Sequence, residues 1–239
     1  MNRPAAPSPF DPTQDLKDAP HTGARMRPKD AATLILVRRD GPEPALLMGR
    51  RASGHVFMAS KWVFPGGRID RADFRAPAAS ELRPQVAALL EKTAPAARAR
   101  ALGLTAIREA FEETGVLLAR AAGPQAAPGP WRAFVASGAL PDLSALSFIA
   151  RAVTPPGRAR RFDARFFMAE ADRLLSLEPA TGDRELDEIA WIPRSQAEDL
   201  DLPAITRFVI KEIAARLADG DRPVPYVYFR HGKHRIDSL

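Results

Sequence analysis

The 239-residue sequence contains no cysteine. A disulfide framework, a zinc site built from thiolates and a cysteine nucleophile are therefore excluded, and the absence fits a reducing, cytoplasmic setting. No apolar run approaches the ~20 residues that a membrane helix needs. The N-terminal segment lacks the apolar core of a signal peptide. We therefore expect neither a membrane span nor a secretion signal.

Long runs of one charge are also missing, although the formal net charge is +6. Basic residues are scattered along the chain and interleaved with acids, whereas a nucleic-acid binder usually gathers them in a patch or stripe. This distribution disfavours nucleic acid as the main partner without excluding it. A basic surface also suits a phosphorylated small molecule.

Strands and helices alternate without an internal repeat. Residues 1–30, rich in proline and alanine, are expected to form an irregular arm, and residues 31–239 a single domain. Short apolar segments bounded by turn residues predict strands. These segments are 31–37, 45–48, 62–64, 146–155, 161–171 and 226–230, and a further strand is expected to follow an acidic loop within 183–193. The pair Gly66-Gly67 after Pro65 is expected to end the third strand in a tight loop.

Helices are predicted from apolar spacings of three and four residues. The expected helices are 103–114, 203–218, a short one near 130–137, and one or two within an Ala-rich insertion at about 74–102. Because these elements mix without a regular βαβ period, we expect an α+β fold, an α/β/α sandwich with a mixed central sheet and a helical insertion.

The segment REAFEETGV, Arg108 to Val116, places Glu109, Glu112 and Glu113 within one helical turn. Like charges at these spacings repel one another. Since Leu104, Ile107 and Phe111 form an apolar stripe on the same helix, the acids would form a wet or cleft-facing stripe. Carboxylate oxygens are the ligands that Mg²⁺ prefers, so a metal would stabilise the cluster. Taken by itself, such a segment is more often a solvated helix face than a metal site.

The upstream residues add to this pattern. A glycine pair after a strand lets the backbone approach a phosphate or metal closely. Taken together, these residues resemble the signature box of the Nudix family, in which a glycine and an acid precede Arg-Glu, an apolar residue, Glu-Glu and a second glycine. The matching positions are Gly67, Asp73, Arg108, Glu109, Ala110, Glu112, Glu113, Gly115 and Val116.

Two features depart from the family pattern. The first acid is Asp73 instead of glutamate, and 34 residues (108 − 73 − 1) separate it from Arg108 instead of the family's seven. A subgroup of the family, typified by the peroxisomal coenzyme A diphosphatase of mammals, has such an interrupted box. The similarity to this subgroup extends over roughly residues 31–193.

The resemblance implies metal-dependent hydrolysis of the pyrophosphate bond in a nucleoside diphosphate linked to another moiety, with Mg²⁺ or Mn²⁺ as cofactor. It assigns Glu112 and Glu113 as metal ligands, with the Gly67 carbonyl beside them. Glu109 is a ligand or the general base, and Arg108 orients the acids. Asp73 is expected to support the loop.

A distal acid is implied as well, and Glu185 fits its position best, with Glu188 close behind. Either could instead belong to an acidic solvated turn, and either could be the base in place of Glu109. Four basic residues are candidates for the substrate phosphates because they can donate to phosphate oxygens. They are Arg50, Arg51, Lys61 and Arg165, each of which could also be structural.

The subgroup makes coenzyme A or an acyl derivative the first choice of substrate. Leu82, Val86, Leu89 and Leu90 of the insertion could form an apolar wall for its arm, or pack on their own domain. The alternatives are ADP-ribose or NADH, an RNA cap, and a catalytically silent module that binds a nucleotide. The sequence also leaves a homodimer open.

Overall fold

The computed structural model describes residues 10–12, 26–52, 60–123, 125–127, 129–177 and 186–239. Strand β1 (Lys29–Arg38) lies inside the central sheet, and its apolar residues are buried on both sides. Leu34 and Leu36 point into one core, and Ile35 and Val37 into the other. A near-continuous apolar run is typical of a strand that is covered on both faces.

The central sheet has nine strands in the order β11-β10-β7-β8-β1-β2-β3, with β4 paired to β1 and β9 to β2. β1 runs parallel to β8, and β10 runs parallel to β7, while the other pairs are antiparallel. The predicted mixed sheet is therefore confirmed. The remaining strands are β2 (Ala45–Arg51), β3 (Trp62–Val63), β4 (Gly66–Arg68), β7 (Ser147–Val153), β8 (Phe162–Glu170), β9 (Leu186–Pro193), β10 (Pro225–Arg230) and β11 (Lys233–Ser238).

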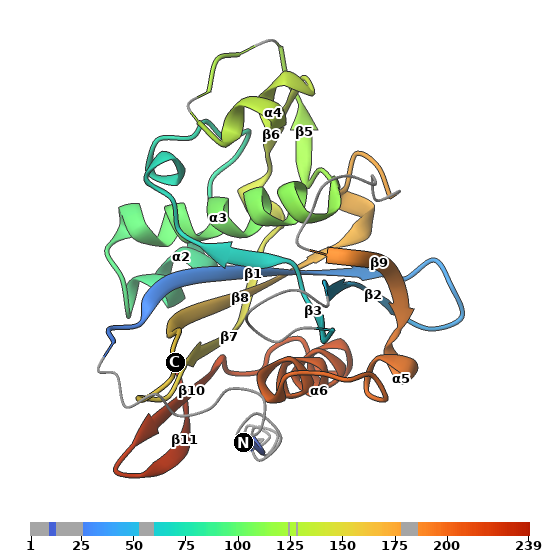
Figure 1. Cartoon of the computed structure of the whole chain (residues 1–239). Helices are drawn as coiled ribbons and strands as arrows, with labels where there is room; N and C mark the ends of the chain where they lie inside the picture. Colours follow the sequence, from blue (N-terminus) through green and yellow to red (C-terminus); the bar gives the residue numbers. More distant parts are fainter. Residues whose placement is uncertain (1–9, 13–25, 53–59, 124, 128, 178–185) are drawn as a thin grey trace.

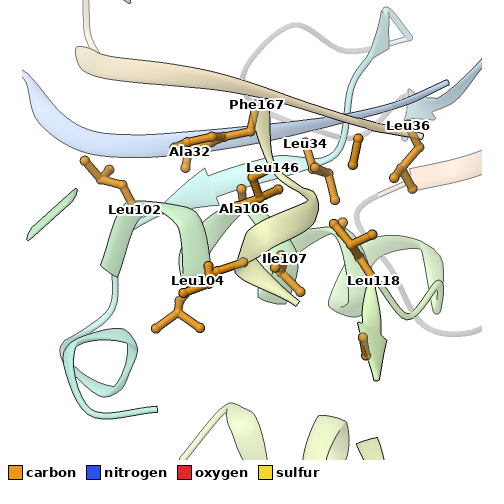
Figure 2. Close-up of a cluster of buried hydrophobic side chains, with 14 of the residues drawn as sticks. Ala32, Leu34, Leu36, Leu102, Leu104, Ala106, Ile107, Leu118, Leu146 and Phe167 are labelled. Carbon is orange, nitrogen blue, oxygen red and sulfur yellow. The ribbon is translucent and has the colours of Figure 1, made fainter. Parts of the chain in front are cut away.

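Helices cover both faces of this sheet (Figure 1). On one face lie α3 (Ala96–Thr114) and α2 (Pro84–Glu91). Figure 2 shows Leu104, Ile107 and neighbouring residues of α3 packed beneath the strand residues Leu34 and Phe167. The predicted apolar stripe of this helix thus faces the core.

The opposite face is covered by α6 (Ala204–Ala218), preceded by the short α5 (Arg194–Ala197). Phe208, Val209 and Ile213 of α6 pack against Ile35 and Ile149 of the sheet. The predicted α/β/α sandwich is confirmed by these two separate cores.

A small unit stands on the outer side of α3 (Figure 1). It consists of the strand pair β5 (Ala119–Ala121) and β6 (Ala139–Pro141) with α4 (Trp131–Ala136). Single 3-10 turns, η1 (Arg71–Phe74), η2 (Leu143–Ala145) and η3 (Ala171–Arg173), complete the described secondary structure. Trp131 is fully buried against the box helix, which makes this unit part of the support of the site.

Two predicted boundaries of the chain are wrong. Lys29 and Asp30, assigned to the N-terminal arm, are paired with β8 in β1. The box helix begins at Ala96 instead of Gly103, because no proline follows Pro95 within it and the Ala-rich end of the insertion continues into it. The C-terminal end agrees with the sequence, since Gly115 has φ 76° and donates its N–H to the Phe111 carbonyl.

Two strands of the central sheet were not predicted. Gly66 and Gly67 do not form a loop but lie in β4, directly opposite Thr33 and Ala32 of β1. The hairpin partner β11 was missed because its turn lacks the usual Asn-Gly or Asp-Gly pair. Its turn residues His231 and Gly232 both have positive φ, 50° and 74°, as a two-residue hairpin requires.

Within the part of the chain that the structure describes, no helix combines the length and apolar character needed to cross a membrane.

Candidate active site

The site is built where β4 ends and the insertion leaves the sheet. Asp70 caps η1 by accepting from the Ala72 N–H at 2.7 Å, and Asp73 accepts from the Asp70 N–H at 2.8 Å. This reciprocal pair fixes the turn that follows the glycine strand. It also turns the Asp73 side chain inward, toward α3.

Asp73 is fully buried and is the residue on which the box converges. Besides the Asp70 N–H, it accepts from Arg108 Nε at 2.9 Å and Nη2 at 3.0 Å, from Thr105 Oγ1 at 2.8 Å, and from Trp131 Nε1 at 2.8 Å. Five hydrogen bonds to one carboxylate satisfy its acceptor sites. The shorter aspartate therefore reaches all the partners that a supporting acid needs here.

Arg108, whose residue exposure is 4%, links this support to the glutamates. Its Nη1 donates to Glu109 Oε1 at 2.9 Å and to Glu112 Oε2 at 2.8 Å, and its Nη2 donates to the Arg68 carbonyl at 3.0 Å. Burial disfavours the charge of Arg108. Its hydrogen bonds to Asp73 and the negative charge of Glu109 nevertheless raise the pKa of Arg108 above the ordinary value. Arg108 is thus a permanent cation that orients two acids.

The three glutamates take different directions. Glu109 lies against Gly67, where a β-carbon would stand 2.6 Å from Glu109 Oε1. Glu112 is the most open of them, with 37% of its side chain exposed. Glu113 is buried and accepts from the Gly66 N–H at 3.1 Å, which ties the helix to β4. Of the three acids in the predicted wet or cleft-facing stripe, Glu113 is thus the one that the glycine strand covers.

The charge of two of these acids is disfavoured in the protein. Burial raises the pKa of Glu109 and of Glu112, and the nearby Arg108 offsets this only in part. These carboxylates have too little positive charge nearby to balance them, and carboxylate oxygens are the ligands that a hard divalent cation prefers. Across the described ranges, however, no group of three or more acids or histidines is already arranged as a metal site.

The structure describes one of the two candidate distal acids. Glu185 lies outside the described residues. Glu188, on β9, is half exposed and has its Oε2 3.2 Å from Nη2 of Arg50. Arg50 and Glu188 therefore neutralise each other in this structure, and both stay predictions as substrate or metal contacts.

The four basic candidates divide into two groups. Lys61 and Arg165 are buried and bound to acids of the protein: Lys61 Nζ lies 2.7 Å from Asp201 Oδ1, and Arg165 Nη1 lies 2.8 Å from Asp30 Oδ1. Neither is among the residues that line the cavity beside the box, and both stay predictions as contacts to substrate phosphates. Arg51 does line that cavity.

A cavity of about 1170 Å³ opens beside the box. Glu109 and Gly67 line it at one end, and Ile205 and Thr206 of α6 line it farther in. Of the three box glutamates, Glu109 is the one that borders it. Three exposed cations that make no ion pair with a described residue also line the cavity, and the sequence reasoning named none of them. They are Lys29, Arg68 and Arg160.

Comparison with known proteins agrees with this geometry. No protein-family model matches the chain. The acyl-coenzyme A diphosphatase NUDT19 of Gallus gallus is 29% identical over 250 residues, covering 77% of this chain and 64% of the relative. The crystal structure of a NUDIX hydrolase from Alicyclobacillus acidocaldarius is 28% identical, with a TM-score of 0.60, covering 83% of this chain and 98% of that one. The chain is therefore similar to Nudix hydrolases in both sequence and fold.

The fold brings the two halves of the interrupted box together. The 34 residues (108 − 73 − 1) between Asp73 and Arg108 leave and return so that the two side chains are hydrogen-bonded. Thr105 and Trp131 complete the arrangement, and no signal in the sequence pointed to either. The chain spans 64% of the length of its avian relative, so the activity of the whole relative does not transfer directly.

Proposed function

We propose that this chain hydrolyses the pyrophosphate bond of a nucleoside diphosphate linked to another moiety, with coenzyme A or an acyl derivative as its substrate. The observation that carries the proposal is the position of Glu109. This acid is oriented by Arg108, borders a 1170 Å³ cavity and lies against the glycine strand. A large cavity with a few convergent polar groups is the usual form of a small-molecule site.

Glu109, Glu112, Glu113 and the Gly67 carbonyl would hold Mg²⁺ or Mn²⁺, which when bound neutralises charge on the phosphoryl oxygens. If Glu109 is not a metal ligand, it can act as the general base, because it borders the cavity and could accept a proton from an attacking water there. The hydroxyl then attacks phosphorus and the bond to the bridging oxygen breaks. Arg68 can donate to the phosphate oxygens at the same rim.

Coenzyme A is favoured over other pyrophosphates by two facts. The avian relative is named for an acyl-coenzyme A diphosphatase activity. The cavity also presents the unpaired Lys29, Arg68 and Arg160, which suit a substrate with a 3′-phosphate in addition to its pyrophosphate. Cleavage would release 3′,5′-ADP and a phosphopantetheine product.

A substrate panel tests this function. Coenzyme A, dephospho-coenzyme A, ADP-ribose, NADH and capped RNA are incubated with Mg²⁺, with Mn²⁺ or with chelator, and products are separated by chromatography. We expect hydrolysis only with metal. A contact to the 3′-phosphate should favour coenzyme A over dephospho-coenzyme A by about 1.5–3 kcal/mol in kcat/KM.

Variants of the box complete the test. Glu112→Gln and Glu113→Gln keep the side-chain shape and should each lower kcat by about a hundredfold or more, while the exposed Glu91→Gln on α2 should leave it unchanged. Unaltered turnover in the box variants would remove these acids from the mechanism. A clear preference for ADP-ribose would make it the substrate in place of coenzyme A. Nucleotide binding without hydrolysis would indicate a catalytically silent module.

A further inference from the structure

Three small residues lie side by side across the sheet on the face that α6 covers. Ala31 of β1 is paired with Ala164 of β8, Ala164 with Ala152 of β7, and Ala152 with Val227 of β10. Arg68 of β4 stands opposite Ala31 at the other end. Residues directly paired across strands share one face of a sheet, and all five of these line the cavity.

Larger residues border this alanine row on both sides. Thr33 and Phe166 occupy the paired positions on one side, and Lys29 and Phe162 on the other. All four line the same cavity. A row of methyl groups between larger side chains forms a trough, which crosses four strand spacings of about 4.8 Å, or ~19 Å in all.

The two ends of the trough differ chemically. At the β4 end it meets Arg68, Gly67 and Glu109, where the pyrophosphate would be cut. At the β10 end it closes against aromatic groups, with the rings of Phe10 and His234 5.0 Å apart. The β4 end thus holds the acid and cation of the box, while the floor of the trough between the two ends is apolar.

We propose that the alanine row binds an unbranched apolar chain carried by the nucleoside diphosphate substrate, with the charged end at Arg68 and the chain extended toward Val227. This inference rests on the proposed function and assigns the acyl arm of its substrate to particular residues. The floor of three alanines and one valine offers no side-chain hydrogen-bonding group, which a nucleobase needs for recognition and an alkyl chain does not.

The insertion does not supply this binding wall. Val86 and Leu90 are buried in the core beneath α3, and Leu82 and Leu89 pack against the same core. None of the four lines the cavity. The earlier hypothesis that they hold the arm of the substrate is therefore wrong, because the insertion covers the opposite face of the sheet.

Binding measured in chelator tests the trough independently of catalysis. The dissociation constants of the full chain for coenzyme A thioesters from acetyl to palmitoyl are measured by calorimetry, at concentrations below micelle formation. Each buried methylene should tighten binding up to about fourfold until the trough is full. Affinity that does not change with chain length would overturn the proposal.

Two variants test whether the acyl chain binds along the alanine row. Ala152→Leu and Ala164→Leu fill the trough and should each weaken long-chain binding by about tenfold or more, while acetyl-coenzyme A binding stays within about twofold. The matched control is Ala97→Leu, on an exposed position of α3, which should change neither. Thermal unfolding of each variant separates misfolding from lost binding. If folded variants keep the full chain-length dependence, the alanine row is not the binding site.

The outcomes for the two proposals are separable. Chain-length-dependent binding that the trough variants abolish would support the trough even if no thioester is hydrolysed. Hydrolysis of coenzyme A with binding independent of chain length would support the proposed function and reject the trough, as expected if a nucleoside occupies this face instead.

Discussion

Asp73 and Arg108 show how a single buried pair supports the site. Both side chains are almost fully inaccessible to solvent, with 5% of Arg108 and 0% of Asp73 exposed. A buried charge is tolerated only while its hydrogen-bonding partners remain in place. The orientation of Glu109 and Glu112 therefore depends on an acid that touches neither of them.

Replacing Asp73 tests this dependence. Asp73→Asn should lower the free energy of unfolding by about 3–5 kcal/mol, because the Arg108 charge loses its buried counterion. Urea unfolding of the variant and of the parent chain measures the change. The control is Asp40→Asn, which breaks an exposed ion pair with Arg38 and should leave stability unchanged within error. An equal free energy of unfolding in the two variants would show that Asp73 does not stabilise the protein as the counterion of Arg108.

The two glycines of β4 serve different purposes. A β-carbon on Gly66 would lie 2.6 Å from the Ala32 carbonyl, which belongs to the backbone and cannot move aside. A β-carbon on Gly67 would meet the carboxylate of Glu109, which is the mobile end of a side chain. Substitution at Gly66 should therefore affect the fold, and substitution at Gly67 the site.

We expect Gly67→Ala to displace Glu109 and lower kcat by about a hundredfold with little change in Tm, since a displacement of roughly 1 Å is enough for such a loss. Gly66→Ala should lower Tm. Gly41→Ala, whose new β-carbon would be 3.7 Å from its nearest neighbour, is the control and should change neither property. Steady-state rates and thermal unfolding distinguish the three variants. A Gly67→Ala enzyme with normal kcat would contradict the placement of Glu109.

At the scale of elements, α3 joins the insertion to the box in one helix. Its first turns are held by Arg100, which donates to Glu81 at 2.9 Å and to the Ala76 carbonyl at 3.1 Å. Its last turn ends at Gly115. Since α2 packs against α3 and the same core, the insertion stabilises the helix that carries the glutamates.

A core substitution in α2 separates this structural role from substrate binding. Leu90 is fully buried, so Leu90→Ala should lower the free energy of unfolding by about 2–5 kcal/mol. The dependence of acyl-coenzyme A binding on chain length should stay as in the parent chain. Leu175→Ala, at a residue 50% exposed, is the control for stability. Loss of long-chain binding in a folded Leu90→Ala protein would indicate that the insertion contributes to substrate binding.

At the scale of the whole molecule, the sheet separates support from binding. One face, under α3 and α2, holds the larger core that positions the box. The other face, under α6, carries the alanine row and most of the cavity. The short β4 joins the two, because its glycines contact Glu109 and its Arg68 faces the trough. A substrate can therefore extend along one face while its pyrophosphate meets acids that are held from the other.

The sequence by itself determined the features that depend on neighbouring residues. The helix end at Gly115, the strand cores and the spacing of Glu109, Glu112 and Glu113 follow from local conformation and periodicity. The Nudix box was also readable, although its halves are separated by an insertion, because residue types and order survive the interruption.

Only the tertiary structure decided what those residues touch. Trp131 and Thr105 meet at Asp73, Lys61 and Arg165 are bound to internal acids, and a strand replaces the expected glycine loop. The alanine row exists only because the strand register aligns residues that are far apart in the chain. Register and face are set by long-range packing and hydrogen bonding, which no local pattern specifies.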